Sequence, residues 1–161
     1  MNGHEQAVGR EHAARALDRT AFGDGPADRA SIAFDLTASY PDEAGLDALR
    51  RTVALDRAAG TVTITDEAAF REDGGDLESV VVSYHPITDD GGDLLVTGER
   101  GALCIETDGE VTAVEHLADA VDMSYRDAFP DERPDVWRAR VGAAETDGSD
   151  RRVELLVRPV E

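Results

Sequence analysis

The stretch Thr61-Val62-Thr63-Ile64-Thr65 decides the fold class, because apolar and polar residues alternate along it without a break. Alternation with a period of two places every second side chain on one face of a β-strand, and β-branched residues favour strands. The same alternation recurs along the chain and predicts further strands within residues 32–40, 52–55, 80–84, 94–96, 103–105, 111–113, 137–141 and 153–157. The pattern therefore favours an all-β chain.

Turn-forming clusters separate these runs at short intervals, at residues 23–26, 57–60, 73–76, 89–92, 108–109 and 147–150. Asp108-Gly109 stands between two β runs, which predicts a tight hairpin joining 102–107 to 110–115. Helix signals are weak: we expect single turns within 41–50 and 124–129, the second with Ser124 as its cap. The prediction is an all-β fold, an antiparallel β-sandwich of about nine or ten strands with few short helical turns. The length fits a single domain spanning residues 1–161.

The charge balance excludes several classes of function. The chain has 161 residues, of which 35 are acidic and 16 basic, so the formal charge is −19, and every basic residue is arginine. Such a surface repels phosphate, which excludes nucleic acid and an anionic membrane surface as partners. There is no run of roughly 20 apolar residues that could cross a membrane, and the segment shows no secretory signal. The single cysteine, Cys104, rules out a disulfide framework.

The same acidity predicts a high-salt environment. Molar salt shortens the Debye length to about 3 Å and screens most of the self-repulsion of such a chain. The absence of lysine and the small apolar side chains point the same way. Because the charge then reflects the solvent, single acidic residues are poor evidence for catalysis or metal binding.

Few residues carry a specific chemical signal. The four histidines match no zinc-binding motif, and the acidic residues in 89–93 lack the spacing of a calcium loop. Tyr40 and Tyr84 are candidates for general acids, although a tyrosine that ends an alternating strand is usually a core residue. Trp137 is the one tryptophan and a candidate for stacking on a sugar ring; its place next to Arg138 and Arg140 in an alternating run favours a core role.

Several stretches, taken in chain order, resemble the heparinase II/III-like polysaccharide lyases. Asn2-Gly3-His4-Glu5-Gln6 is similar to their NG-x-x-Q segment, and Phe34 to Pro41 is similar to their strand that ends in Ala-x-Tyr-Pro. Residues 51–57 and 62–66 resemble the next two strands, and residues 136–141 and 153–159 resemble the closing strands. The resemblance covers nearly the whole chain, and the order of the motifs is more specific than any one of them.

This resemblance implies the C-terminal part of the β-sandwich that follows an α-helical toroid in these lyases. It also implies β-elimination on uronic-acid polysaccharides, with tyrosine and histidine supplied largely by the toroid and its interface, and a zinc ion held by His, Asp and His. Those residues would precede Met1, so no catalytic residue, zinc ligand or other cofactor site is predicted within this chain. Asn2, Gly3 and Gln6 match a motif near the family's active-site edge.

The sequence thus predicts a non-catalytic C-terminal β-sandwich module of a heparinase II/III-like lyase, inactive alone. Its expected partners are the missing N-terminal portion, with the toroid and the preceding strands, and an anionic polysaccharide. Self-association through an uncovered sheet edge is also expected. The alternative is a free-standing β-sandwich that binds carbohydrate or protein without chemistry.

Overall fold

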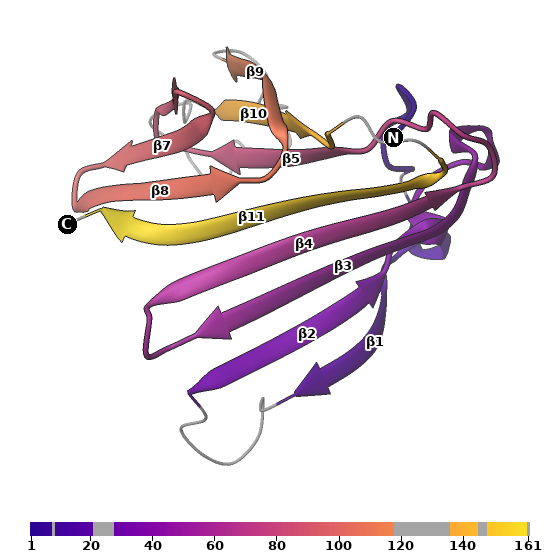
Figure 1. Ribbon diagram of the computed structural model, residues 1–161, viewed down its shortest axis with the longest axis horizontal. Coiled ribbons are helices and arrows are strands. Elements are labelled where there is room, and N and C mark those ends of the chain that lie inside the picture. Colours follow the sequence, from indigo (N-terminus) through magenta and orange to yellow (C-terminus); the bar gives the residue numbers. More distant parts are fainter. Residues whose placement is uncertain (8, 21–27, 118–135, 145–147, 161) are drawn as a thin grey trace.

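The computed structural model describes residues 1–7, 9–20, 28–117, 136–144 and 148–160, and within these ranges β-strands are the main secondary structure (Figure 1). Three short 3-10 helices precede the central strands: η1 (Arg10–His12), η2 (Thr37–Ser39) and η3 (Asp42–Ala44). The described strands are β1 (Arg15–Thr20), β2 (Arg29–Asp35), β3 (Leu46–Asp56), β4 (Thr61–Phe70), β5 (Glu78–Ser83), β6 (Ile87–Asp90), β7 (Asp93–Gly98), β8 (Gly101–Thr107), β9 (Glu110–His116), β10 (Trp137–Gly142) and β11 (Asp150–Val160).

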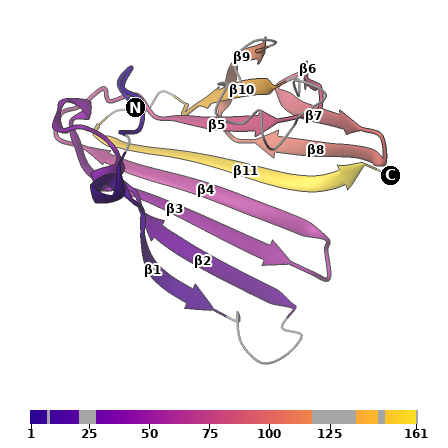
Figure 2. The ribbon, with the colours of Figure 1, turned by 180° about the vertical axis from the view of Figure 1, so that it is seen from behind.

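The strands form two antiparallel sheets that pack together as a β-sandwich, which confirms the predicted fold class. The large sheet has eight strands in the order β1-β2-β3-β4-β11-β8-β7-β6, and the small sheet has three in the order β5-β10-β9. Both views show the small sheet lying against one end of the large sheet, while β1, β2 and β3 extend away from it (Figures 1 and 2). β9 and β10 lie near β6, and Ser79 of β5 contacts Asp66 of β4.

Alternation along the strands separates the two faces of the large sheet. The face toward the small sheet carries Ile64, whose register partners are Val53 on β3 and Leu155 on β11. The opposite face carries Thr63 and Thr65 of β4 and the ion pair between Arg158 and Glu106. The sequence pattern of residues 61–65 thus sets which side of the sheet is apolar.

The core lies between the two sheets and consists mainly of aliphatic side chains. Its largest fully buried members are Leu49, Leu77, Ile87, Leu94, Val141 and Val153. They come from both sheets and from the β4–β5 connection, so the packing of one sheet on the other buries them together. Among the described residues, no helix is long and apolar enough to span a membrane.

The hairpin predicted at Asp108-Gly109 is wrong, because the chain changes sheets there. β8 belongs to the large sheet and β9 to the small one. The carboxylate of Asp108 accepts hydrogen bonds from Glu154 N at 2.6 Å and from Arg152 Nη1 at 2.6 Å, so it is held by β11. A side chain at position 109 would place its Cβ against the Gly142 carbonyl oxygen, closer than two such atoms can approach, so glycine allows the close crossing.

The strand predicted over residues 32–40 also differs, since β2 ends at Asp35. The Asp35 carboxylate accepts a hydrogen bond from the Thr37 N–H at 3.0 Å, and this local bond turns the chain into η2. Residues 41–50 contain the short helix η3 but continue as β3. β6 was not predicted, because Ile87 is its only apolar residue, and the turn expected at 124–129 lies outside the described residues.

Candidate functional site

The segment containing Asn2, Gly3 and Gln6 is fixed against η3 and against the connection between β4 and β5. The Asn2 side chain donates a hydrogen bond to Ala44 O at 2.9 Å and accepts one from Asp76 N at 2.6 Å. Asn2 has a φ of 46° and Gly3 a φ of 75°, a left-handed turn that Asn and Gly tolerate best. These two residues therefore shape the N-terminal segment and hold it in place.

Replacing Asn2 by alanine is expected to release this segment locally. The change removes two hydrogen bonds and places alanine at a positive φ, which together cost about 2 kcal/mol. Exchange of the Asp76 amide hydrogen should then be about 30-fold faster, since each 1.4 kcal/mol is a factor of ten. Asn2→Gly is the matched control, because it loses the same bonds without the backbone strain and should show a smaller increase. Unchanged exchange in Asn2→Ala would contradict the anchoring role.

A cavity of about 570 Å³ opens beside this segment, and we call it the N-terminal cavity. Four parts of the fold line it: residues 1 and 3–6, the η2 region, the face of β3 and β4, and the outer side of β5 and β10. Gly3 and Gln6 are among its lining residues, as are Tyr40, Arg51 and Asp66. The structure thus brings Gly3 and Gln6, two of the three predicted motif residues, to one cavity. Asn2 does not line the cavity; it holds the segment through its bonds to Ala44 and Asp76.

A chain of polar contacts runs across the floor of the cavity and joins the two sheets. Arg51 donates to both carboxylate oxygens of Asp66, through Nε and Nη2, each at 2.6 Å. The Ser79 hydroxyl donates to the same carboxylate. Asp66 has only 1% of its side chain exposed, whereas Arg51 keeps 36%. The buried carboxylate is therefore fully partnered, and the guanidinium remains accessible from the cavity.

Tyr40 stands next to this chain of contacts. Burial raises the pKa of its phenol, against the smaller opposing effects of the Arg51 guanidinium and of a hydrogen bond with Gln6. The bond to Asp66 in turn raises the pKa of Arg51. At neutral pH the cavity therefore offers a protonated phenol beside a permanent cation, groups that donate hydrogen bonds to hydroxyl or carboxylate oxygens.

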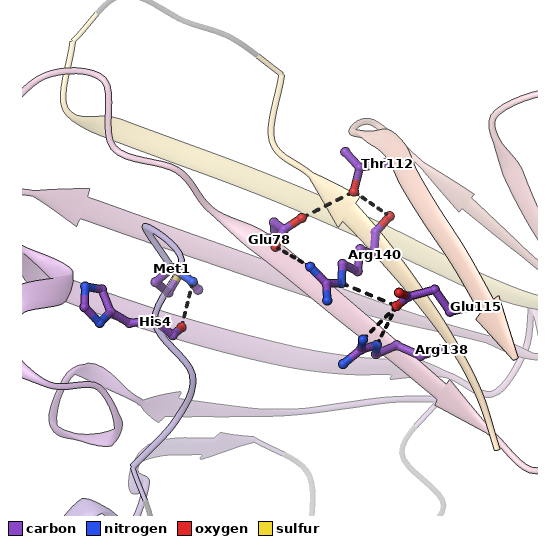
Figure 3. A network of polar contacts seen from close by, with 7 residues as sticks. All are labelled: Met1, His4, Glu78, Thr112, Glu115, Arg138 and Arg140. Carbon is purple, nitrogen blue, oxygen red and sulfur yellow. Dashed lines mark hydrogen bonds and ion pairs between the residues drawn. The ribbon is translucent and has the colours of Figure 1, made fainter. Parts of the chain in front are cut away.

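Two more arginines, Arg138 and Arg140, enter the cavity from the outer face of β10; Figure 3 shows Arg140 between Glu78 and Glu115, and Arg138 beside Glu115. Arg138 pairs with Glu115 at 2.8 Å. Arg140 lies 3.7 Å from Glu115 and 4.0 Å from Glu78. Every one of the three cavity arginines thus has an acidic partner, so the lining is close to neutral in a chain of charge −19.

Trp137 does not join this site. Its ring stacks on His116 with the ring centroids 4.5 Å apart and an angle of 18° between the planes. It packs against the core as a partly buried residue and is not among the residues that line the N-terminal cavity. Sugar stacking by Trp137 stays a prediction, at a place separate from Asn2, Gly3 and Gln6.

The remaining candidate residues form no metal-binding cluster within the described part of the chain. Among the described residues, no three His, Cys, Asp or Glu side chains converge on a point where a metal could be held. Cys104 is partly buried on a strand of the large sheet. A second cavity, of about 520 Å³, lies where β3, β4 and β11 meet and includes Arg50 and Arg152, but it contains none of the residues predicted from the sequence.

Sequence reasoning missed Arg51 and Asp66 as site residues, although a signal for them exists. The turn at residues 57–60 pairs Asp56 with Thr61, and counting back from it pairs Arg51 with Asp66. An arginine opposite an aspartate on the apolar face of a hairpin indicates a buried ion pair. Arg138 and Arg140 carry no such local signal, because their place depends on how the small sheet packs.

Comparison with known proteins gives structural relatives but no sequence relatives: no protein-family model and no curated protein matches the chain. The heparan sulfate lyase HepC from Pedobacter heparinus superposes with a TM-score of 0.63 at 15% sequence identity, over 92% of this chain and 22% of that one. A structure of heparinase III superposes with a TM-score of 0.60 at 14% identity, over 92% and 21% of the two chains.

The TM-scores establish a shared fold, the low identities support no conclusion beyond the fold, and the coverage shows how much of the lyases is shared. The chain spans about a fifth of the length of either protein, and the matched region is their C-terminal part. The eight-stranded and three-stranded sheets described above account for that match. The chain therefore has the β-sandwich fold found in the C-terminal part of heparinase III-type lyases.

Proposed function

We propose that this chain is the C-terminal β-sandwich module of a heparinase III-like polysaccharide lyase, and that it has no lyase activity alone. The observation that carries the proposal is the superposition of 92% of the chain on about a fifth of two such lyases. The ordered motifs, from Asn2-Gly3 to the closing strands, support the same assignment from the sequence. The reaction proposed for the whole protein is β-elimination on uronic-acid polysaccharides.

Within that protein, the N-terminal cavity is the part of the module that we assign to the edge of the active site. Gln6 and Tyr40 line it together with Arg51, Arg138 and Arg140. These donors suit the hydroxyl and carboxylate oxygens of a uronic acid. The base and acid that move protons in the elimination are assigned to the rest of the protein.

The zinc ion implied by the family resemblance does not fit the described part of this chain, since no suitable set of ligands converges there. A structural zinc site needs four donors in close contact. The proposal therefore places any zinc ligands outside the described residues, and no step of the proposed role uses the metal.

A lyase assay tests the proposal directly. The chain, incubated in 2 M NaCl with alginate, heparin or heparan sulfate, is expected to give no ultraviolet absorbance from an unsaturated product. A longer polypeptide, which adds the reading frame upstream of Met1, is expected to give that absorbance. Product formation by the chain alone would contradict the proposal, as would an upstream frame that encodes no helical toroid.

A free-standing binding module is the second candidate, favoured by the accessible donors of the N-terminal cavity. It predicts saturable binding of a uronic-acid oligosaccharide by the chain alone, with weaker binding in Tyr40→Phe. Calorimetry is the suitable measurement, because Trp137 stacks on His116 away from the cavity and is a poor reporter. Binding by the chain, together with an inactive longer polypeptide, would favour this candidate over the lyase module.

A further inference from the structure

The charged side chains that line the N-terminal cavity balance one another. Among the described residues they are three arginines and three carboxylates, namely Arg51, Arg138, Arg140, Glu5, Asp66 and Glu78. The cavity lining is therefore neutral in a chain whose formal charge is −19. The cavity volume of about 570 Å³ lies within the ~300–1,000 Å³ typical of small-molecule sites. An anion that enters is not repelled by a net charge of the lining, but it finds no surplus of positive charge either.

Arg51 is the arginine best placed to bind a carboxylate, because it is held in place and keeps free donors. Its Nε and Nη2 donate to the two carboxylate oxygens of Asp66, and the Ser79 hydroxyl holds that carboxylate from the small sheet. A guanidinium has five N–H donors, so Asp66 leaves several of them unused, and 36% of the Arg51 side chain is exposed. A donor that is already fixed loses little conformational entropy on binding. The remaining N–H groups can therefore form charge-assisted hydrogen bonds with one carboxylate.

The other two arginines of the cavity have less to offer an anion. Arg138 directs Nε and Nη2 to the Glu115 carboxylate, both at 2.8 Å. Arg140 lies between Glu115 and Glu78, at 3.7 Å and 4.0 Å (Figure 3). A second anionic group on the ligand would have to displace one of these carboxylates.

Two carboxylates of the lining would repel such a second group. Glu5 is exposed and has no ion-pair partner among the described residues. Glu78 has 28% of its side chain exposed, and its nearest cation in the described part of the chain is Arg140 at 4.0 Å. Like charges brought together at a binding site are a common means of excluding the wrong partner. The cavity thus combines donors for one carboxylate with repulsion of any further negative charge.

We propose that the N-terminal cavity accepts a sugar unit that carries one carboxylate and rejects one that also carries sulfate. Arg51, positioned by Asp66 and Ser79, binds the carboxylate. Glu5 and Glu78 repel the sulfate. The substrate class that follows is an unsulfated uronic-acid polysaccharide, although a heparan sulfate lyase is among the structural relatives. This inference rests on the proposed function, because that proposal assigns the cavity to the edge of the active site.

Three forms of one heparin hexasaccharide test the inference by titration calorimetry with the chain. They are the sulfated form, a desulfated form with acetylated amines, and a desulfated form whose carboxylates are also reduced to alcohols. In 1 M NaCl the Debye length is about 3 Å, so charges elsewhere on the chain contribute little to the difference. We expect the desulfated form to bind at least about tenfold more tightly than either of the others. Equal or tighter binding of the sulfated form would overturn the inference, as would the absence of binding by all three.

The double variant Glu5→Gln/Glu78→Gln tests which residues reject sulfate. Its affinity for the sulfated form should rise about tenfold, and its affinity for the desulfated form should stay unchanged. The matched control is Glu99→Gln/Glu110→Gln, which alters two exposed glutamates outside the cavity. Both double variants change the formal charge from −19 to −17. An equal gain in the two variants would assign the selectivity to the charge of the whole chain and overturn the roles of Glu5 and Glu78.

Arg51→Lys tests the contact with the carboxylate. Lysine keeps a positive charge beside Asp66 but lacks the planar set of donors, so the desulfated form should bind at least about tenfold more weakly. The form with reduced carboxylates should bind as it does to the wild type. Ser79→Ala should give a smaller loss that is also confined to the form with carboxylates. An equal loss for both forms would contradict the assignment, and circular dichroism verifies that each variant folds.

Cleavage by the longer polypeptide separates this inference from the proposed function. Faster release of unsaturated product from the desulfated form than from the sulfated form would support both. Equal rates on the two forms would overturn the substrate class and leave the lyase function in place. No product from either form, together with selective binding by the chain, would contradict the lyase function and support the selectivity of the cavity.

Discussion

Replacement of Asp66 by alanine is expected to lower the free energy of unfolding by about 3–5 kcal/mol, because it leaves a guanidinium and a hydroxyl without their buried partner. Asp66 is 1% exposed and accepts hydrogen bonds from Arg51 and Ser79, which belong to different sheets. Arg51 retains 36% exposure and can turn toward water, which favours the lower end of this range. Urea unfolding in 2 M NaCl measures the change, since urea adds no charge.

Arg158→Gln is the matched control for this experiment. Arg158 and Glu106 also form a short ion pair between neighbouring strands, but their side chains are 45% and 39% exposed. Exposed ion pairs contribute little to stability, because water and salt screen them, so this variant should unfold close to the wild type. Ser79→Ala should fall between the two, at about 1 kcal/mol. An Asp66→Ala variant as stable as Arg158→Gln would show that the buried network does not hold the sheets together.

Most of the strands were predicted from the alternation of apolar and polar residues, because a strand with one buried face requires that pattern. Residues 61–65 predicted β4, and the turn at 57–60 fixes its register with β3 without further information. The same reasoning failed at Asp108, where the sequence is typical of a hairpin. The groups that hold Asp108 are on Arg152 and Glu154 of β11, so a contact more than forty residues away along the chain decides the local path.

The site was predictable only in part, for a related physical reason. Gly3 and Gln6 were found through a resemblance, and the structure brings them to the N-terminal cavity. Arg51 and Asp66 follow from hairpin register, which sequence alone supplies. Arg138 and Arg140 face this cavity only because the edge of the small sheet lies over β4, and no periodicity within β10 contains that information.

Thermal stability of the chain is expected to rise by about 10 °C or more between 0.1 M and 1 M NaCl. The acidic residues outnumber the arginines by 19, so at most 16 of the 35 carboxylates can have their own guanidinium. The Debye length falls from about 10 Å to about 3 Å over this range, which screens repulsion between neighbouring surface charges. Salt also weakens exposed pairs such as Arg29–Asp56, but such pairs contribute little to stability.

A variant with fewer charges separates screening from a general effect of salt. The triple substitution of Asp89, Asp90 and Asp93 by asparagine changes the formal charge from −19 to −16, and the amide oxygen introduced by Asp89→Asn can still accept the hydrogen bond from Gly92 N. All three lie at the β6–β7 hairpin tip, outside the core. Screening predicts that this variant melts above the wild type in 0.1 M NaCl and gains less on going to 1 M. Self-repulsion is not what salt relieves if the melting temperature of the variant rises as much as that of the wild type, or if sucrose reproduces the rise. The high-salt adaptation inferred from the charge would then lose its physical basis.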